Sequence, residues 1–269
     1  MTKNLNQRFR YSSILLKQLV KTDFKLRYQG SALGYLWSLL KPLFLFGILY
    51  VVFVGIVGVD YGVDNDGVYL LFGIVMWSFF SELTGGSVTS VVGKGDLLRK
   101  INFPKYVIVL ATGFSALINL LLNMLIVMVF MVISGVQLSW GIFWAPLLFA
   151  ELIIFSLGIG FFLSAAYVKL RDIGYIWDVF LQAGFYLTPI LFPLSFAPIW
   201  GQKLLMLNPV AQIIQDLRYI LVSNKTTTIG EVYGGNEFMR VVPLSIVLIV
   251  SVLCIIYFKK KAGSFAEEI

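Results

Sequence analysis

Six long apolar stretches run through this chain, and lysine and arginine are concentrated in every second gap between them. Two of these stretches, 42–59 and 241–258, contain no charged residue, and none occurs anywhere in 106–150. A helix needs about 20 consecutive apolar residues to cross the hydrocarbon core of a bilayer. Stretches of this length and number therefore predict an all-α integral membrane protein that crosses the membrane several times.

The positive charge is divided unequally between two sets of gaps. Successive gaps alternate between the two sides of the membrane. The chain ends and the gaps on their side hold seventeen basic residues, whereas the gaps on the other side hold four. Because loops rich in Lys and Arg stay on the cytoplasmic side, both termini are predicted to be cytoplasmic. Six crossings also return the chain to the side on which it began. The six predicted transmembrane helices cover 33–59, 68–92, 106–134, 140–167, 173–194 and 241–258.

Composition excludes several classes of protein. The chain is 59% hydrophobic and only 13% charged, unlike an average soluble domain. Its net charge of +7 lies mostly beside helix ends, where anionic membrane lipids attract it, so no nucleic-acid partner is predicted. The single cysteine, Cys254, falls inside the last apolar stretch and reads as a small buried hydrophobe. The first apolar stretch follows a long polar and basic segment, which does not resemble a cleavable signal peptide.

The first 30 residues predict an amphipathic helix in the membrane interface rather than a crossing. Lys17, Lys21 and Lys25 fall on one face of a helical wheel, and apolar side chains fall on the other. Asp23 and Arg27 project from the apolar side, four residues apart, a spacing that allows an ion pair. Two interpretations stay open: part of this face contacts protein, or the long side chains reach back to the interface.

Two loops are more than simple turns. The segment 93–104 reads GKGDLLRKINFP, in which glycines break the chain before a short amphipathic piece. The segment 195–240 on the outer side is long and largely apolar, yet neither of its halves is long enough to span. We interpret it as two short re-entrant helices before the last helix, in preference to a solvated loop. The fifth helix is expected to end or bend near Thr188 and Pro189.

Most of the chemistry of an enzyme is missing from the sequence. There is no histidine, which excludes common zinc sites and histidine-based triads. Gly93 and Lys94 lack the surrounding glycine and hydroxyl residue of a phosphate-binding loop. We therefore predict no catalytic residue, no metal site and no bound cofactor in this chain.

Three acidic residues inside predicted helices need an explanation, because a charge at the bilayer centre is costly. Asp178 lies near the cytoplasmic end of its helix, where a basic neighbour can satisfy it. Glu82 and Glu151 lie deeper, and each either lines a hydrated cavity or is protonated against a polar neighbour. The many serines and threonines around Glu82 favour a cavity there.

Aromatic residues make up 16% of the chain, and those on the first and fifth helices are candidates for a translocation path. Aromatic faces let a sugar chain slide by stacking without tight binding; the alternative is ordinary helix packing or a lipid-facing belt. The candidate pathway residues are Phe44, Phe46, Tyr50, Phe53, Glu82, Phe180, Phe185 and Tyr186.

An ordered series of short motifs resembles the polysaccharide-exporting permeases among the type-2 ATP-binding-cassette (ABC) exporters. Each motif is weak alone, but they cover nearly the whole chain in the right order. They are 23–28 (DFKLRY), 31–34 (SALG) with Trp37 and Pro42, 97–104 (LLRKINFP), 171–173 (RDI), 185–190 (FYLTPI), 208–209 (NP) and 265–267 (FAE).

This resemblance implies a single transmembrane permease domain over 1–269 that acts as a homodimer in the bacterial plasma (inner) membrane. It implies a separate nucleotide-binding ATPase that binds ATP and Mg²⁺, and a lipid-linked glycan substrate of the O-antigen, capsule or teichoic-acid type. In such permeases the first and fifth helices line the path, the loop at 93–104 docks on the ATPase, and the amphipathic start braces that interface. The implied coupling residues are Lys94, Leu97, Leu98, Arg99, Lys100, Phe103, Asp23 and Arg27.

Other functions stay open on the sequence alone. A drug or small-lipid exporter of the same superfamily is the nearest alternative. An ion-coupled secondary transporter would use Glu82 and Glu151. A membrane enzyme acting on polyprenyl carriers would need clustered acids, whereas the cytoplasmic loops offer only the scattered Asp96 and Asp172.

Overall fold

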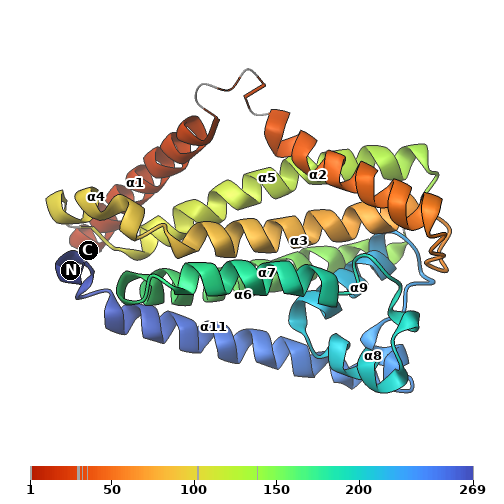
Figure 1. The fold of residues 1–269 in the computed structure, drawn as a ribbon. Coiled ribbons are helices and arrows are strands. Elements are labelled where there is room, and N and C mark those ends of the chain that lie inside the picture. The colour runs from red at the N-terminus through yellow and green to blue at the C-terminus, as the bar shows by residue number, and fades with distance from the viewer. Residues whose placement is uncertain are drawn as a thin grey trace.

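The protein is a bundle of long helices, most of which run roughly along one direction, while the first lies at a steep angle to them (Figure 1). In this computed structural model every regular element of the described residues is helical, which confirms the predicted class. The long helices are α1 (Thr2–Tyr28), α2 (Leu36–Tyr50, continued by a π-helical turn Val51–Ile56), α3 (Asp66–Val88), α5 (Tyr106–Ile133), α6 (Ala145–Lys169), α7 (Ile173–Leu187) and α11 (Val241–Lys261). The short ones are α4 (Gly95–Lys100), α8 (Ile199–Met206), α9 (Pro209–Leu221), α10 (Ile229–Val232) and α12 (Phe265–Glu268). The structure describes residues 2–28, 31, 33–34, 36–101, 103–137 and 139–268, without the side chains of 2–9, 24, 26–28 and 266.

Helix α3 forms the centre of the bundle. It packs against α2, α5, α6, α7 and α9, and its side chains are buried on every face. Leu70, Leu71 and Phe72, which point in three different directions at about 100° per residue, are all fully buried. From Gly67 to Trp77 the helix is apolar on all faces, and such a segment needs neighbours on all sides, so its sequence explains its central place.

Five helical segments of the described chain are long and apolar enough to cross a membrane, and they correspond to five of the six predicted crossings. The remaining one, predicted at 173–194, is the shorter α7. This helix ends at Leu187 because Thr188 adopts an extended conformation ahead of Pro189, which confirms the predicted break. Its 15 residues span only about 22 Å, less than the hydrocarbon core. The count of six crossings therefore stays a prediction.

Two consecutive short helices, α8 and α9, occur where re-entrant helices were expected. Helix α9 begins at Pro209, and the side chain of Asn208 caps it by accepting a hydrogen bond from the amide of Val210 at 3.1 Å. Most of α9 is buried, including its polar residues, so it is not a solvated loop. How deeply the two helices enter a membrane stays a prediction.

The opposite end of the bundle carries α4, and both chain ends lie there, away from α8 and α9 (Figure 1). Helix α1 packs against α5 at this end, and Leu19 of α1 is buried in one cluster with Val107 and Val109 of α5. Lys17 and Lys21 remain exposed. Part of the apolar face of this amphipathic helix therefore contacts protein, one of the two interpretations that its sequence allowed.

Candidate functional site

A cavity of about 820 Å³ opens between α2, α3, α5 and α7. Its walls combine aromatic rings with amides, hydroxyls and a few charged groups. The two outer walls, α2 and α7, have no buried residue, so the structure leaves much of their surface uncovered. The lining includes Trp37, Lys41, Trp77, Phe79, Glu82, Asn119, Asn123, Asp178, Gln182, Phe185 and Tyr186.

A chain of hydrogen bonds fixes the polar wall of the cavity. The amide of Asn119 donates to a carboxylate oxygen of Glu82 at 2.6 Å. One turn further along α5, the amide of Asn123 donates to the carbonyl of Asn119 at 2.8 Å and to the carbonyl of Ser38 at 3.3 Å. These bonds join α2, α3 and α5 around the cavity, and Glu82 is among the residues that line it.

Aromatic rings form the rest of the wall. The ring centroids of Trp77 and Phe185 lie 6.3 Å apart, and those of Phe185 and Tyr186 lie 5.5 Å apart in an edge-to-face arrangement. Tyr186 and Trp37 line the cavity and are both exposed in this chain. Rigid aromatic faces beside a few hydrogen-bonding groups are typical of sites for ligands with apolar faces and polar edges.

The structure brings together only part of the pathway predicted from sequence. Glu82, Phe185 and Tyr186 line the cavity. Phe180 lies on another face of α7, against a second, apolar space. The four aromatic residues predicted on the first helix do not line the cavity; Phe46 instead packs edge-on against Phe130. The remaining three are Phe44, which is exposed, Tyr50, which lies beside Phe46, and Phe53, which packs against the main core.

Several cavity residues were not singled out from the sequence. Asn119 and Asn123 are the clearest case, because two amides one turn apart interrupt a long charge-free helix. Polar groups at that spacing share a face, so the signal was present. Glu151 is buried in α6 and does not line this cavity. Asp178 lines the cavity, while Arg171, a basic residue near the start of the same helix, lies over the ring of Tyr167.

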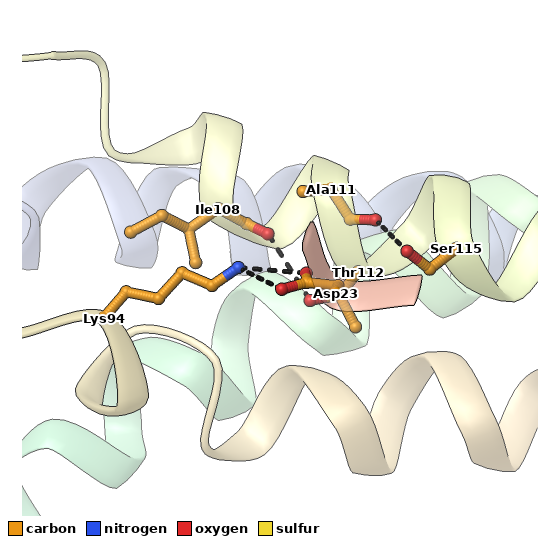
Figure 2. A network of polar contacts seen from close by, with 6 residues as sticks. All are labelled: Asp23, Lys94, Ile108, Ala111, Thr112 and Ser115. Atoms are coloured by element: carbon orange, nitrogen blue, oxygen red, sulfur yellow. Dashed lines mark hydrogen bonds and ion pairs between the residues drawn. The ribbon is translucent and has the colours of Figure 1, made fainter. Parts of the chain in front are cut away.

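At the α4 end an ion pair links the predicted coupling loop to the amphipathic helix. The ammonium of Lys94 contacts both carboxylate oxygens of Asp23 at 2.8 and 2.9 Å (Figure 2). Their side chains are only 19% and 28% exposed, which reduces screening by solvent. Asp23 therefore pairs across 71 residues of sequence. The side chain of Arg27, the partner suggested by the sequence, lies outside the described residues.

The remaining coupling residues divide by burial. Arg99 and Lys100 are exposed, and Leu97 is partly buried. Leu98 and Phe103, at 7% and 5% exposure, pack inside the cluster that holds Leu19 of α1. Because these two side chains are buried within their own chain, they support the loop and present little surface to a partner.

At the α8–α9 end, Arg218 of α9 is completely buried and binds the broken end of α7. It donates hydrogen bonds to the carbonyls of Pro189 at 2.6 Å and Ile190 at 3.3 Å, and to Gln215 at 3.2 Å. Burial lowers the pKa of Arg218 from its usual value. Carbonyls freed by the break after Thr188 thus find a donor, as buried backbone groups require.

The fold defines a multi-pass helical membrane protein, and its cavity between α2, α3, α5 and α7 is lined by polar groups and aromatic rings. Comparison with known families identifies it further: residues 14–222 match the ABC-2 type transporter family, and the chain belongs to that family.

Its relatives include two proteins named O-antigen export system permease protein RfbA. The one from Myxococcus xanthus is 27% identical over 271 residues, the whole of both chains. The one from Klebsiella pneumoniae is 29% identical over 238 residues, 86% of this chain and 90% of the relative.

Proposed function

We propose that this chain is the permease subunit of an ATP-driven exporter that moves a lipid-linked polysaccharide of the O-antigen type out of the cytoplasm. The observation that carries the proposal is the cavity between α2, α3, α5 and α7 in a chain of the ABC-2 type transporter family. Amides and carboxylates beside aromatic faces suit sugar rings, which have polar edges and apolar faces. The names of the relatives point to the same class of substrate.

Two copies of the chain would enclose the path. Helices α2 and α7 flank the cavity, and neither has a buried residue in a single copy. Apolar residues such as Phe44, Ile48 and Tyr186 are among the most exposed on these helices. A second copy packed against α2 and α7 would cover them and close the cavity from the side. The basic gaps favour cytoplasmic termini. The similarity to O-antigen export permeases supports an inner-membrane location.

The energy would come from a separate ATPase that binds ATP and Mg²⁺. The segment 93–104 is the proposed docking loop, with Arg99 and Lys100 as its exposed contacts. The Asp23–Lys94 ion pair and the buried Phe103 would hold the loop against α1. A partner that grips this loop differently in two states can shift the permease between them.

The experiment is reconstitution in liposomes with the nucleotide-binding subunit. Movement of the lipid-linked glycan between the two leaflets is followed with an added glycosidase, which reaches only the glycan in the outer leaflet. Transport that requires ATP, and is lost with an ATPase variant unable to hydrolyse it, supports the proposal. Flux driven by an ion gradient through this chain alone would replace it with a secondary transporter. ATP-driven flux of small lipids or drugs without glycan would favour the other exporter class.

Docking is tested by charge reversal at Arg99 and Lys100. The double variant to Glu should lose co-purification of the ATPase while remaining in the membrane at normal abundance. The matched control is Lys203→Glu, an exposed lysine on α8 at the opposite end of the bundle. Normal co-purification of the Arg99 and Lys100 variant would remove these residues from the docking surface.

A further inference from the structure

A second space, of about 870 Å³, lies on the other side of α7, between α3, α6, α7 and α11. No charged residue lines it. Its walls are aliphatic and aromatic, and include Phe80, Phe155, Trp177, Phe180, Leu253 and Tyr257. We call this space the apolar groove.

The walls of the apolar groove are held in place by ring stacking. Trp177 and Phe180 stack with centroids 4.8 Å apart and planes at 14°, and Phe80 and Phe155 stack at 6.2 Å and 15°. The indole nitrogen of Trp177 donates to the hydroxyl of Thr84 at 3.2 Å, so its polar atom is satisfied away from the groove. The groove is thus a shaped apolar surface that is present before any ligand binds.

Helix α7 separates the apolar groove from the polar cavity. Ile176, Phe180 and Ala183 line the groove. Asp178 and Gln182, on another face of the same helix, line the cavity.

One ring borders both spaces. Trp77 of α3 lines the groove and the cavity. A Cβ atom at Gly184 would lie 2.6 Å from the Cη2 atom of this indole, so only glycine lets the α7 backbone rest directly on it. The two spaces are therefore neighbours across a single helix and a shared side chain.

We propose that the apolar groove binds the hydrocarbon chain of the lipid-linked substrate while its glycan occupies the polar cavity. This proposal rests on the function proposed above, and it assigns a binding place to the lipid part of that substrate. Thr188 and Asn208 line the groove where α7 ends and α9 begins, and the phenol of Tyr257 lines it in the last turns of α11. Because Thr188 and Asn208 bring two polar side chains to one end of the groove, we place the polar linkage of the lipid at the α8–α9 end.

The physical argument concerns competition with bilayer lipid. An acyl chain gains no hydrophobic free energy on moving from the bilayer to an apolar groove, because both surroundings are apolar. A chain tethered to a glycan that is already in the neighbouring cavity has a high effective concentration at the groove. The two weak sites across α7 therefore favour a molecule with both parts over free phospholipid.

The test is photolabelling of the complete complex, permease and ATPase, in lipid nanodiscs. The probe is a polyprenyl diphosphate disaccharide with a diazirine at the far end of its chain, and the comparison probe is a phosphatidylglycerol with a diazirine in its acyl chain. At equal mole fraction, the glycan-bearing probe should label groove residues such as Phe180 and Leu253 about tenfold more than the phospholipid does. Labelled peptides are mapped by mass spectrometry.

A pair of variants on α7 sharpens the result. Ala183→Phe fills the groove and should reduce labelling there by about tenfold. Val179→Phe is the matched control, because Val179 is exposed and lines neither space. The probe should label the groove of the Val179→Phe variant as strongly as that of the parent protein.

Three outcomes would overturn the inference. The glycan-bearing probe could label outward positions such as Val252 as strongly as the groove, or both probes could label the groove equally. Exclusion of both probes, with cross-links from a second copy in the groove, would show a protein occupant instead. ATP-driven glycan transport is measured on the same preparation: transport without groove labelling refutes only this inference, whereas no transport refutes the proposed function.

Discussion

The guanidinium of Arg218 lies over the ring of Tyr69, with its Cζ atom 3.6 Å from the ring centroid, and its Nε donates to the carbonyl of the same tyrosine at 3.0 Å. This contact joins α9 to the central helix α3. The other donors of Arg218 hold the carbonyls of Pro189 and Ile190 after α7. The buried side chain of Arg218 therefore connects α9, the central helix α3 and the end of α7, which is one wall of the cavity.

Replacing Arg218 with Met should destabilise the protein by about 2–5 kcal/mol, because the variant leaves several buried carbonyls unpaired. Arg218→Lys keeps a positive charge but loses the fork of donors, so it should recover only part of the loss. Thermal unfolding in detergent, followed by tryptophan fluorescence, measures the effect. The control is Arg240→Lys, whose side chain is 43% exposed. An unchanged midpoint for Arg218→Met would contradict this account of the carbonyl contacts.

Gly73 leaves the space that Arg218 fills. A Cβ atom at this position would lie within 2.1 Å of the Nη2 atom of Arg218. Gly73→Ala should therefore displace the guanidinium and destabilise the protein by about 1–3 kcal/mol. In the Arg218→Met background the same change should cost much less, because the crowded group is gone. Equal costs in the two backgrounds would show that Gly73 matters for another reason.

The ion pair between Asp23 and Lys94 predicts a charge-swap rescue. Asp23→Lys or Lys94→Asp alone places like charges together where α1 meets the 93–104 loop and should weaken both stability and ATPase co-purification. The double swap should restore about 1 kcal/mol of coupling, near the upper range for partly exposed pairs. A double-mutant cycle on unfolding midpoints gives this coupling free energy. A value of zero would show that the ion pair contributes nothing to stability.

Five of the six predicted crossings were readable from the sequence as long apolar helices, because hydrophobic length acts locally along the chain. The break after α7 was also predictable, since Pro189 disfavours a helical residue before it. The two different faces of α7, one toward the polar cavity and one toward the apolar groove, were also readable in principle. At about 100° per residue, Phe180 and Phe185 lie about 140° apart and face different spaces. Grouping them as one aromatic path ignored this rotation.

Contacts between distant segments could not be predicted in the same way. Arg218 is one of four basic residues in the outer gaps, and nothing in its local sequence shows that it is completely buried against Tyr69. Phe103 precedes a proline in a basic loop, a pattern that fits an exposed contact and a buried one equally well. Burial depends on which helices meet, and that is settled by tertiary packing.

The Glu82–Asn119 contact predicts a loss of transport without a loss of protein. Asn119→Leu removes the donor 2.6 Å from the carboxylate of Glu82 and makes one cavity wall apolar. Under the proposed function, ATP-driven glycan transport should fall about tenfold. Glu82→Gln retains an acceptor oxygen and should lose less. The control is Ser115→Ala on the same helix, because Ser115 donates to the carbonyl of Ala111, 3.0 Å away (Figure 2). Transport at the parental rate in Asn119→Leu would remove this wall from the path.

Tyr61, in the turn between α2 and α3, predicts an alkaline loss of stability. Its hydroxyl donates to the carbonyl of Leu191 at 2.9 Å, and burial raises its pKa to about 12. An unfolded tyrosine has a pKa of about 10, so between about pH 10 and 12 the unfolded state loses this proton while the folded state keeps it. The free energy of unfolding should therefore fall as the pH rises through that range.

Tyr61→Phe isolates this contribution. At neutral pH the variant should be less stable by about 1–3 kcal/mol, because the buried carbonyl of Leu191 loses its donor. It has no proton to release, so the stability difference between parent and variant should shrink as the pH rises from about 10 to about 12. Unfolding midpoints of both proteins across that range measure the difference, and the comparison cancels the titration of the other tyrosines and lysines. A difference that stays constant with pH would show that Tyr61 titrates as it does in the unfolded chain.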